Sequence, residues 1–304
     1  MRRGNKKIIR YRHLVERVLV VFVILVVATI LFVRESHAPP PAPLVSSGEL
    51  RVWFFDVGQG DAILIDTPDH HQILVDGGPS QAILSKLGQV LPPWDRSVDA
   101  IVLTHPHLDH VAGLMSVLER YDVAAIYDGG ALARTGAMDA FGEDAIVEGA
   151  AIDHLVAGDR FVYGDVTLDV LAPTRAFDGT YPKDPNEASL VLLLTYRDTT
   201  VLLMGDATDD VERDILSTVG DIDVLKVGHH GSRTSSSTEL LDDVTPELAI
   251  VSCGIDNSYG HPHPATIQRL DDRGIRIERT DLDGDILLTS TGGEPTVKPS
   301  PLPF

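Results

Sequence analysis

The stretch LTHPHLDHVAGL, residues 103–114, overlaps the end of an apolar segment and carries four side chains that can bind metal ions. These side chains are His105, His107, Asp109 and His110. Alternation along an extended turn points the first two in the same direction, and the last two stand where a helix is expected to begin. A lone histidine is usually structural, but four donors at this spacing favour two cation sites. One site would use the imidazole pair, and the other a carboxylate with an imidazole.

Three more groups of metal-capable residues follow apolar segments further along the chain. Asp206 comes after the segment 201–204. A Gly-Asp turn is common and by itself does not indicate a metal site. Asp206 is a candidate ligand because two cations need a carboxylate that bridges them. His229 and His230 lie between glycines, which let a ligand approach closely. The group HPHP at 261–264 leads into a predicted helix, and a rigid loop without chemistry is an alternative interpretation of it.

The body of the chain alternates short apolar segments with amphipathic ones. Strands are predicted at 50–57, 61–67, 72–76, 98–103, 123–127, 160–163, 165–171, 189–196, 199–204, 222–227, 247–252, 275–279 and 284–289. Helices are predicted at 80–90, 109–120, 207–219 and 264–273. Many strands come first and mixed units follow, so we expect an α/β fold in which sheets pack together with helices outside.

The amino-terminal region has the pattern of a membrane anchor. Residues 18–33 read VLVVFVILVVATILFV, and seven Lys or Arg residues precede them. A helix of this length covers about 24 Å of a hydrocarbon core about 30 Å thick, and flanking arginines can reach the interfaces. The positive-inside bias places the amino end in the cytoplasm and the body outside it. We therefore predict a single-pass anchor in the cell membrane, with a cleaved signal peptide as the alternative.

Composition divides the chain into four segments. Residues 1–36 are predicted as a cytoplasmic basic segment with the transmembrane helix, and 37–48 as a proline-rich linker with polyproline II character. Residues 49–292 form the predicted folded body, and 293–304, which contain several prolines, a flexible tail.

The charge of the chain is unevenly distributed. The formal net charge is −20 over 304 residues, with +6 in residues 1–36 and −26 in the remaining 268. Hydrophobic residues at 43% and charged residues at 23% exclude a wholly disordered chain. The single cysteine, Cys253, excludes a disulfide framework and cysteine-rich metal sites, so nitrogen and oxygen ligands are expected. The acidic body favours solubility and counts against non-specific binding to nucleic acid.

The motifs resemble those of the metallo-β-lactamase superfamily, whose core pattern H-x-H-x-D-H stands at 105–110. The closer resemblance is to the catalytic domain of ComEC, the DNA-internalisation competence protein. Its pattern appears in order as FFDVGQGDAILI (54–65), VDGG (75–78), LTHPHLDHVAGL (103–114), NEASLVL (186–192), LLMGDA (202–207), VGHHGS (227–232) and SYGHPHP (258–264). The order and spacing agree over about residues 50–290, nearly the whole body.

The resemblance implies a four-layer αββα sandwich over residues 49–292, with two divalent cations at the edge of two sheets. It also implies a ligand set: His105 and His107 for the first cation, Asp109, His110 and His229 for the second, and Asp206 as the bridge. Asp76 corresponds to a buried acid that organises the surrounding loops. Many members bind the first cation with a third histidine where this chain has Asn186, as the ComEC-like branch does. An oxygen-rich site suits manganese as well as zinc.

The expected reaction is hydrolysis by a hydroxide that bridges the cations. Paired cations lower the pKa of water and neutralise oxygens of the substrate. Asp109 or Asp206 would orient the hydroxide, and His230 and His261 are candidate proton donors to the leaving group. Further candidates for contacts with the substrate or the ligands are Asp76, Gln59, Asp61, Asn186, Ser232 and His263.

The branch resemblance favours phosphodiester substrates, with DNA outside the membrane as one candidate. The same hydroxide would serve a lactone, thioester or β-lactam, so carbonyl hydrolysis remains open, as does a non-catalytic surface module. ComEC proteins have a many-helix membrane channel and this chain has one predicted anchor, so a separate DNA-uptake channel protein is a candidate partner. The sequence does not predict the oligomeric state.

Overall fold

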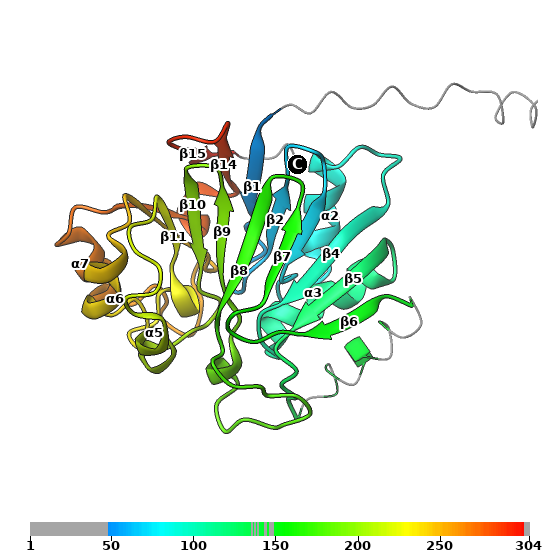
Figure 1. Cartoon of the computed structure of the whole chain (residues 1–304), viewed down its shortest axis with the longest axis horizontal. Helices are drawn as coiled ribbons and strands as arrows, with labels where there is room; N and C mark the ends of the chain where they lie inside the picture. Colours follow the sequence, from blue (N-terminus) through cyan, green and yellow to red (C-terminus); the bar gives the residue numbers. More distant parts are fainter. Residues whose placement is uncertain are drawn as a thin grey trace, which may run out of the picture. The chain divides into compact units, whose positions relative to one another are not determined.

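Two β-sheets form the centre of the fold (Figure 1). The computed structural model describes residues 48–300, except 135, 137, 139, 143, 144 and 146–148. The first sheet contains β1 (Leu50–Phe54), β2 (Ile63–Asp66), β3 (Gln72–Val75), β4 (Ser97–Leu103), β5 (Asp122–Asp128), β6 (Ala151–His154), β14 (Ile286–Ser290) and β15 (Thr296–Pro299). Its order is β15-β14-β1-β2-β3-β4-β5-β6, and the strands from β3 to β6 are parallel.

The second sheet contains β7 (Arg160–Tyr163), β8 (Val166–Ala172), β9 (Val191–Tyr196), β10 (Thr199–Leu203), β11 (Val224–Lys226), β12 (Leu248–Val251) and β13 (Arg276–Arg279). Its order is β13-β12-β11-β10-β9-β8-β7, and the strands from β10 to β13 are parallel. Loops that follow parallel strands all begin at the carboxyl ends of those strands. Each sheet therefore has one end at which side chains from several loops can converge.

Helices cover the outer faces of both sheets. Those with described bounds are α2 (Ala82–Val90), α3 (Leu108–Leu118), α5 (Asp209–Ile215), α6 (Thr238–Val244) and α7 (Pro264–Asp271). The shorter helix α8 (Thr280–Asp283) and the 3₁₀ turns η1 (Pro185–Ala188) and η2 (Gly228–Gly231) lie in the connections between strands. In Figure 1, α2 and α3 lie beside the first sheet, and α5, α6 and α7 lie on the side of the second.

Three apolar cores hold these layers together. The central core joins the inner faces of the two sheets, and β1 shows how the sequence builds it: Val52 and Phe54 are buried there, while Trp53 between them packs on the helix side. A second core lies between the first sheet and α2 and α3, and a third lies between the second sheet and α5, α6 and α7. The predicted αββα order of layers is confirmed.

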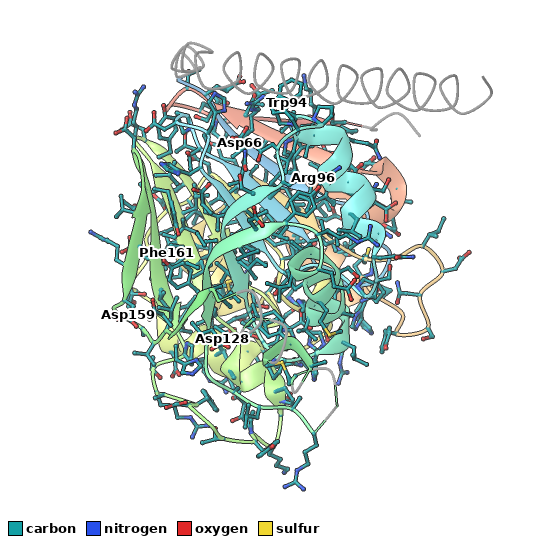
Figure 2. All side chains as sticks on the ribbon, turned by 90° about the vertical axis from the view of Figure 1, so that its right-hand side faces the viewer. Asp66, Trp94, Arg96, Asp128, Asp159 and Phe161 are labelled. Carbon is teal, nitrogen blue, oxygen red and sulfur yellow. The ribbon has the colours of Figure 1, made fainter. Side chains whose placement is uncertain are left out.

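The two sheets also meet through aromatic side chains near β7. Phe161, labelled in Figure 2, lies on β7 and stacks on Tyr127 of β5, with ring centroids 4.7 Å apart and planes at 20°. Stacked aromatic pairs add to the gain from apolar burial. This contact ties the edge of the second sheet to the parallel part of the first.

The predicted elements match the structure where apolar runs are long. Several short described elements were absent from the prediction: β6, α6, α8, β15 and the turns η1 and η2. The helix α6 has seven residues and begins at Ser237, whose Oγ accepts a hydrogen bond from the backbone of Leu240. The loose tail predicted for residues 293–304 is wrong over Thr296–Pro299, which pairs antiparallel with β14. A short edge strand that contains proline gives little signal in sequence.

The predicted anchor at 18–33 and most of the linker lie outside the described residues. Within the part of the chain that the structure describes, no helix has the length and apolar character needed to cross a bilayer.

Candidate metal centre

The predicted ligands gather where strands from both sheets end. Residues 104–110 follow β4, and α3 starts at Leu108, so Asp109 lies in its first turn. Asp206 follows β10, and His230 follows β11 in the turn η2. A carboxylate in the first turn of a helix is stabilised by the helix dipole.

A first group of donors consists of His105, His107 and Asp206. Nε2 of His105 lies 2.9 Å from Nδ1 of His107 and 3.6 Å from Oδ2 of Asp206. One ligand atom from each of these residues lies within 4.8 Å of the others. The other ring nitrogen of His105 lies 3.1 Å from Oγ1 of Thr104, which keeps Nε2 directed into the group.

A second group consists of Asp109, His110 and His230, next to the other oxygen of Asp206. Oδ1 of Asp206 lies 3.4 Å from Nε2 of His110 and 3.4 Å from Nε2 of His230. Nε2 of His230 also lies 3.4 Å from Oδ2 of Asp109. The two oxygens of Asp206 therefore face different groups, which is the arrangement expected of a carboxylate that bridges two cations.

The buried atoms at the centre lack the partners that buried polar atoms normally have. Oδ1 of Asp206 and Nε2 of both His110 and His230 have no hydrogen-bond partner among the described residues. Such atoms cost about 1–3 kcal/mol each when they stay unpaired, so natural proteins nearly always satisfy them. Nitrogen and carboxylate oxygen are ligands for divalent cations such as zinc or manganese, and two cations would satisfy these atoms.

The electrostatics of the second group favour positive charge. Burial opposes the charge on His230, but the carboxylates of Asp206 and Asp61 outweigh it and raise its pKa to about 10. Burial also opposes the charge on His110, and Asp206 and Asp76 raise its pKa well above the usual value. Bound cations would interact with the same carboxylates and so compete with protons for these histidines.

Asp76 lies behind the donor groups and contacts residues on both sides of the strand end. Its Oδ1 accepts a hydrogen bond from the backbone N–H of Thr104 at 2.9 Å, and its Oδ2 accepts one from Oγ1 of the same residue at 2.7 Å. Oδ2 also lies 2.7 Å from Nδ1 of His110. Contacts of this kind fix the ring of a metal-binding histidine. Asp76 itself has a φ of 57°, a left-handed conformation that is strained for a residue with a side chain.

The structure distinguishes the two adjacent histidines of GHHG. His230, predicted as a proton donor, lies in the second donor group, with its side chain 2% exposed. His229, predicted as a ligand of the second cation, lies outside every donor group found among the described residues. Its Nε2 is 3.7 Å from Oδ2 of Asp206, on the side of the first group, and its side chain is 24% exposed. The geometry thus favours His230 as the ligand.

A cavity of about 360 Å³ opens onto the centre. It is lined by Gln59, Pro106, His107, Leu108, Asp109, Asp206, His229, His230, Tyr259 and His261. Tyr259 is 69% exposed, and its ring stacks against that of His261 with centroids 6.0 Å apart and planes at 27°. The cavity therefore combines metal donors with an exposed aromatic wall.

His261 lines this cavity as a neutral imidazole. Burial and the nearby charges of His229 and His230 lower the pKa of His261 to about 4. Its Nδ1 is buried without a hydrogen-bond partner among the residues that the structure describes. Near neutral pH, His261 suits a hydrogen bond to a substrate oxygen better than the donation of an imidazolium proton.

The remaining predicted residues are divided between the cavity and its surroundings. Gln59 lines the cavity, and its Oε1 accepts a hydrogen bond from the backbone of Gly254. Ser232 bonds within its own loop to Thr234, and His263 caps α7 by accepting from the backbone of Ala265. Both of these contacts join residues that are two positions apart in the sequence.

Asn186 is buried in η1, and its Oδ1 lacks a hydrogen-bond partner in the described part of the chain. Asp61 lies behind His230, with Oδ1 3.3 Å from Nδ1 of that histidine. Sequence reasoning did not single out two supporting residues, Thr104 and Lys226. The sequence offers only one hint for Lys226, a lysine at the end of an apolar strand, because a buried lysine normally has a charged partner.

Comparisons with known proteins identify the family of the chain. The family model described as "Metallo-beta-lactamase superfamily" matches residues 55–255. ComE operon protein 3 of Bacillus subtilis is 31% identical over 259 residues, which cover 79% of this chain and 33% of that protein. Competence protein ComA of Neisseria gonorrhoeae is 31% identical over 252 residues, which cover 82% of this chain and 33% of that protein. The chain thus spans about a third of the length of these curated relatives.

One solved structure with a similar fold is the metallo-β-lactamase fold protein YhfI from Bacillus subtilis. It has a TM-score of 0.51 at 14% identity, covering 75% of this chain and 95% of that one. At this identity the likeness concerns the fold alone.

Proposed function

Because the chain belongs to the metallo-β-lactamase superfamily, in the branch of the ComEC-like competence proteins, we propose that this hydrolase cleaves phosphodiester bonds. The observation that carries the proposal is the position of Asp206, whose two oxygens face two separate groups of donors at 3.4–3.6 Å. This arrangement fits a pair of divalent cations, zinc or manganese.

The residues of the chain have distinct roles in this proposal. His105, His107 and Asp206 hold the first cation, and the second is held by Asp109, His110, His230 and the shared Asp206. When bound, such a pair lowers the pKa of water and neutralises oxygens of the substrate. Asp109, whose pKa is lowered to about 2 although burial opposes this, stays a carboxylate and can orient a water molecule.

The cavity residues bind and orient the substrate. His229 and His261 lie with ring centroids 5.5 Å apart on the cavity wall, where a ring N–H of each can donate a hydrogen bond to a non-bridging phosphate oxygen. Tyr259 offers an exposed ring on which a flat group of the substrate, such as a nucleobase, can stack. A tetrahedral phosphodiester that carries a flat group matches these contacts.

DNA is the substrate class that we propose, since one relative is named Competence protein ComA and another, from Haemophilus influenzae, is named Recombination protein 2. The −26 charge outside residues 1–36 disfavours long duplexes, whose binding depends on basic side chains along the phosphates. We therefore propose that single strands or ends enter the cavity, where one phosphate at a time meets the centre.

We also propose that residues 18–33 anchor the protein in the cell membrane, with the body outside the cytoplasm and next to a separate DNA-uptake channel protein. The support is the apolar run and the basic segment before it. Fractionation of cells without detergent tests the anchor: the full-length chain is expected with the membranes, and its recovery in the soluble fraction contradicts the anchor.

Turnover on two classes of substrate tests the function. We expect the full chain in detergent, with Zn²⁺ or Mn²⁺, to cleave bis(p-nitrophenyl) phosphate and short single-stranded DNA faster than a lactone or thioester. His107→Ala should lower the rate by at least about 100-fold, because a ligand is lost. His71→Ala is the matched control, since His71 is half-exposed and pairs with Asp99 away from the centre. Faster turnover of the carbonyl substrates would favour the alternative hydrolase, and no metal-dependent turnover on either class contradicts the enzyme.

A further inference from the structure

A lysine and an aspartate form an ion pair inside the protein beside the metal centre. Lys226 ends β11, and its side chain is 0% exposed. Its Nζ lies 2.8 Å from Oδ2 of Asp61 and donates at 3.0 Å to the carbonyl oxygen of Val227. Asp61, 165 positions away in sequence, is 2% exposed. Each charge would be costly to bury without the other, so the two side chains depend on each other.

The second oxygen of Asp61 faces a histidine of the metal centre. Nδ1 of His230 hydrogen-bonds to the carbonyl oxygen of Ser252 at 3.0 Å, and Oδ1 of Asp61, which has no hydrogen-bond partner among the described residues, lies 3.3 Å from the same nitrogen as a charge contact. A carbonyl oxygen can only accept a hydrogen bond, so Nδ1 carries the hydrogen. The opposite ring nitrogen, Nε2, faces Asp206 and Asp109 at 3.4 Å each. With its hydrogen at Nδ1, the ring can present the lone pair of Nε2 to a cation.

We propose that Lys226 and Asp61 form a positioning pair that orients His230 for the second cation. The inference rests on the metal-dependent function proposed above and adds Lys226 to the residues that support it. Lys226 occupies Oδ2 of Asp61 and so leaves Oδ1 for His230. A carboxylate behind a metal-binding histidine fixes its ring and makes it a better ligand. Lys226 thus acts on the cation site through two other residues.

Direct binding of a cation by Asp61 is the main alternative. Asp61 does offer an oxygen within 4.8 Å of donor atoms of Asp206 and His230. A cation there would stand close to the buried ammonium group of Lys226, and two like charges repel strongly where water is excluded. The ion pair therefore favours a supporting role for Asp61.

A second lysine–aspartate pair shows what a purely structural pair looks like in this fold. Nζ of Lys86 lies 2.9 Å from Oδ2 of Asp285, whose side chain is 2% exposed. The other oxygen of Asp285 accepts a hydrogen bond from the backbone of Asp56. Asp285 belongs to none of the donor groups formed by the described residues. Lys86→Met therefore serves as a matched control for Lys226→Met.

Metal titration of the full chain in detergent tests the inference. The protein is stripped with a chelator and titrated with Co²⁺, followed by its absorbance, and with Zn²⁺, followed by calorimetry. We expect Lys226→Met and Asp61→Asn to raise the dissociation constant of the second equivalent by about 10- to 100-fold and to leave the first unchanged. The double variant should bind the second equivalent no more weakly than the single variant that binds it less tightly. The reason is that both substitutions act through the orientation of His230. Lys86→Met should lower the thermal midpoint but bind both equivalents as the wild type does.

The outcomes separate positioning from stability. If Lys226→Met melts cooperatively and binds both Co²⁺ equivalents as tightly as the wild type, the pair is only structural and the inference is overturned. If Lys226→Met does not fold, the double variant Lys226→Met with Asp61→Asn gives the same decision, because it leaves no buried charge of this pair without its partner. A wild type that binds two cations but hydrolyses no ester overturns the proposed function and leaves the positioning inference to be decided by the titrations.

Discussion

Nδ1 of His110 lies 2.7 Å from Oδ2 of Asp76, and both side chains are 0% exposed. Asp76 holds the backbone and the hydroxyl of Thr104 as well, so a single carboxylate joins the end of β4 to the first turn of α3. This contact directs Nε2 of His110 at Asp206 before any cation arrives. Preorganisation of this kind lowers the cost of binding a metal ion.

We expect Asp76→Asn to weaken binding of the second cation by about 10- to 100-fold and to lower the free energy of unfolding by about 1–3 kcal/mol. An amide cannot accept all three hydrogen bonds that the carboxylate accepts. Calorimetric titration and urea unfolding measure the two effects. Asp99→Asn is the control, because Asp99 also pairs with a histidine but is 37% exposed and distant from the centre. Equal effects of the two substitutions would contradict a special role for Asp76.

Substitution of the adjacent histidines distinguishes their roles. We expect His230→Ala to bind one cation equivalent instead of two, because Nε2 of His230 is a donor of the second group. His229→Ala should keep both equivalents and instead bind the phosphodiester substrate more weakly, since His229 lines the cavity. Elemental analysis after dialysis gives the stoichiometry. If His229→Ala binds one cation equivalent and His230→Ala binds two, then His229 is the ligand of the second cation, as the resemblance implies.

Local spacing explains why most of the centre could be predicted. His105, His107, Asp109 and His110 lie at one strand end and one helix start, so their directions follow from backbone geometry alone. The choice between His229 and His230 could not be predicted in this way. Both have left-handed φ angles, 47° and 53°, which neither strand alternation nor helical periodicity describes. Their directions depend on the surrounding tertiary contacts, among them Asp61 and Ser252.

Partners that are distant in sequence explain what was missed. The burial of Lys226 depends on Asp61, 165 positions away, and no local pattern links them. The same holds for β15, which forms a strand because it pairs with β14 and whose own residues give little indication of a strand. Long apolar strands such as β4 were predictable, because they are buried whichever strand lies beside them.

A glycine in α3 controls how closely this helix approaches the loop that carries Asp76. A Cβ at Gly113 would stand 1.8 Å from the carbonyl oxygen of Gly77, so Gly113→Ala must displace the helix. We expect its free energy of unfolding to fall by about 3 kcal/mol, with weaker metal binding because α3 carries Asp109 and His110.

Gly88→Ala in α2 is the matched control, because a Cβ at this exposed position meets nothing within 4 Å. It should raise the free energy of unfolding by about 0.5–1 kcal/mol, since alanine favours the helix. Urea unfolding of the two variants measures both effects. An unchanged free energy of unfolding for Gly113→Ala would contradict this prediction, because it would show that α3 can move away from the loop at Gly77 without loss of stability.

The pair of His154 and Asp128 should make stability depend on pH. Asp128, labelled in Figure 2, ends β5, and its Oδ1 bonds to Nδ1 of His154 at the end of β6. Burial opposes the charge on His154, but the hydrogen bond and charge of Asp128 raise its pKa above the usual value. A histidine whose pKa rises on folding stabilises the protein fully below its unfolded pKa of about 6.5, and this contribution is lost as pH rises through the folded pKa.

We therefore expect His154→Gln to destabilise the protein more at about pH 5.5 than at about pH 9, where the histidine is neutral in both states. Urea unfolding of the wild type and the variant across this range gives the difference at each pH. The difference should be modest, because the side chain of His154 is 43% exposed and solvent screens the pair. A difference that is constant with pH, or larger at high pH, would mean that His154 contributes through packing rather than through its charge.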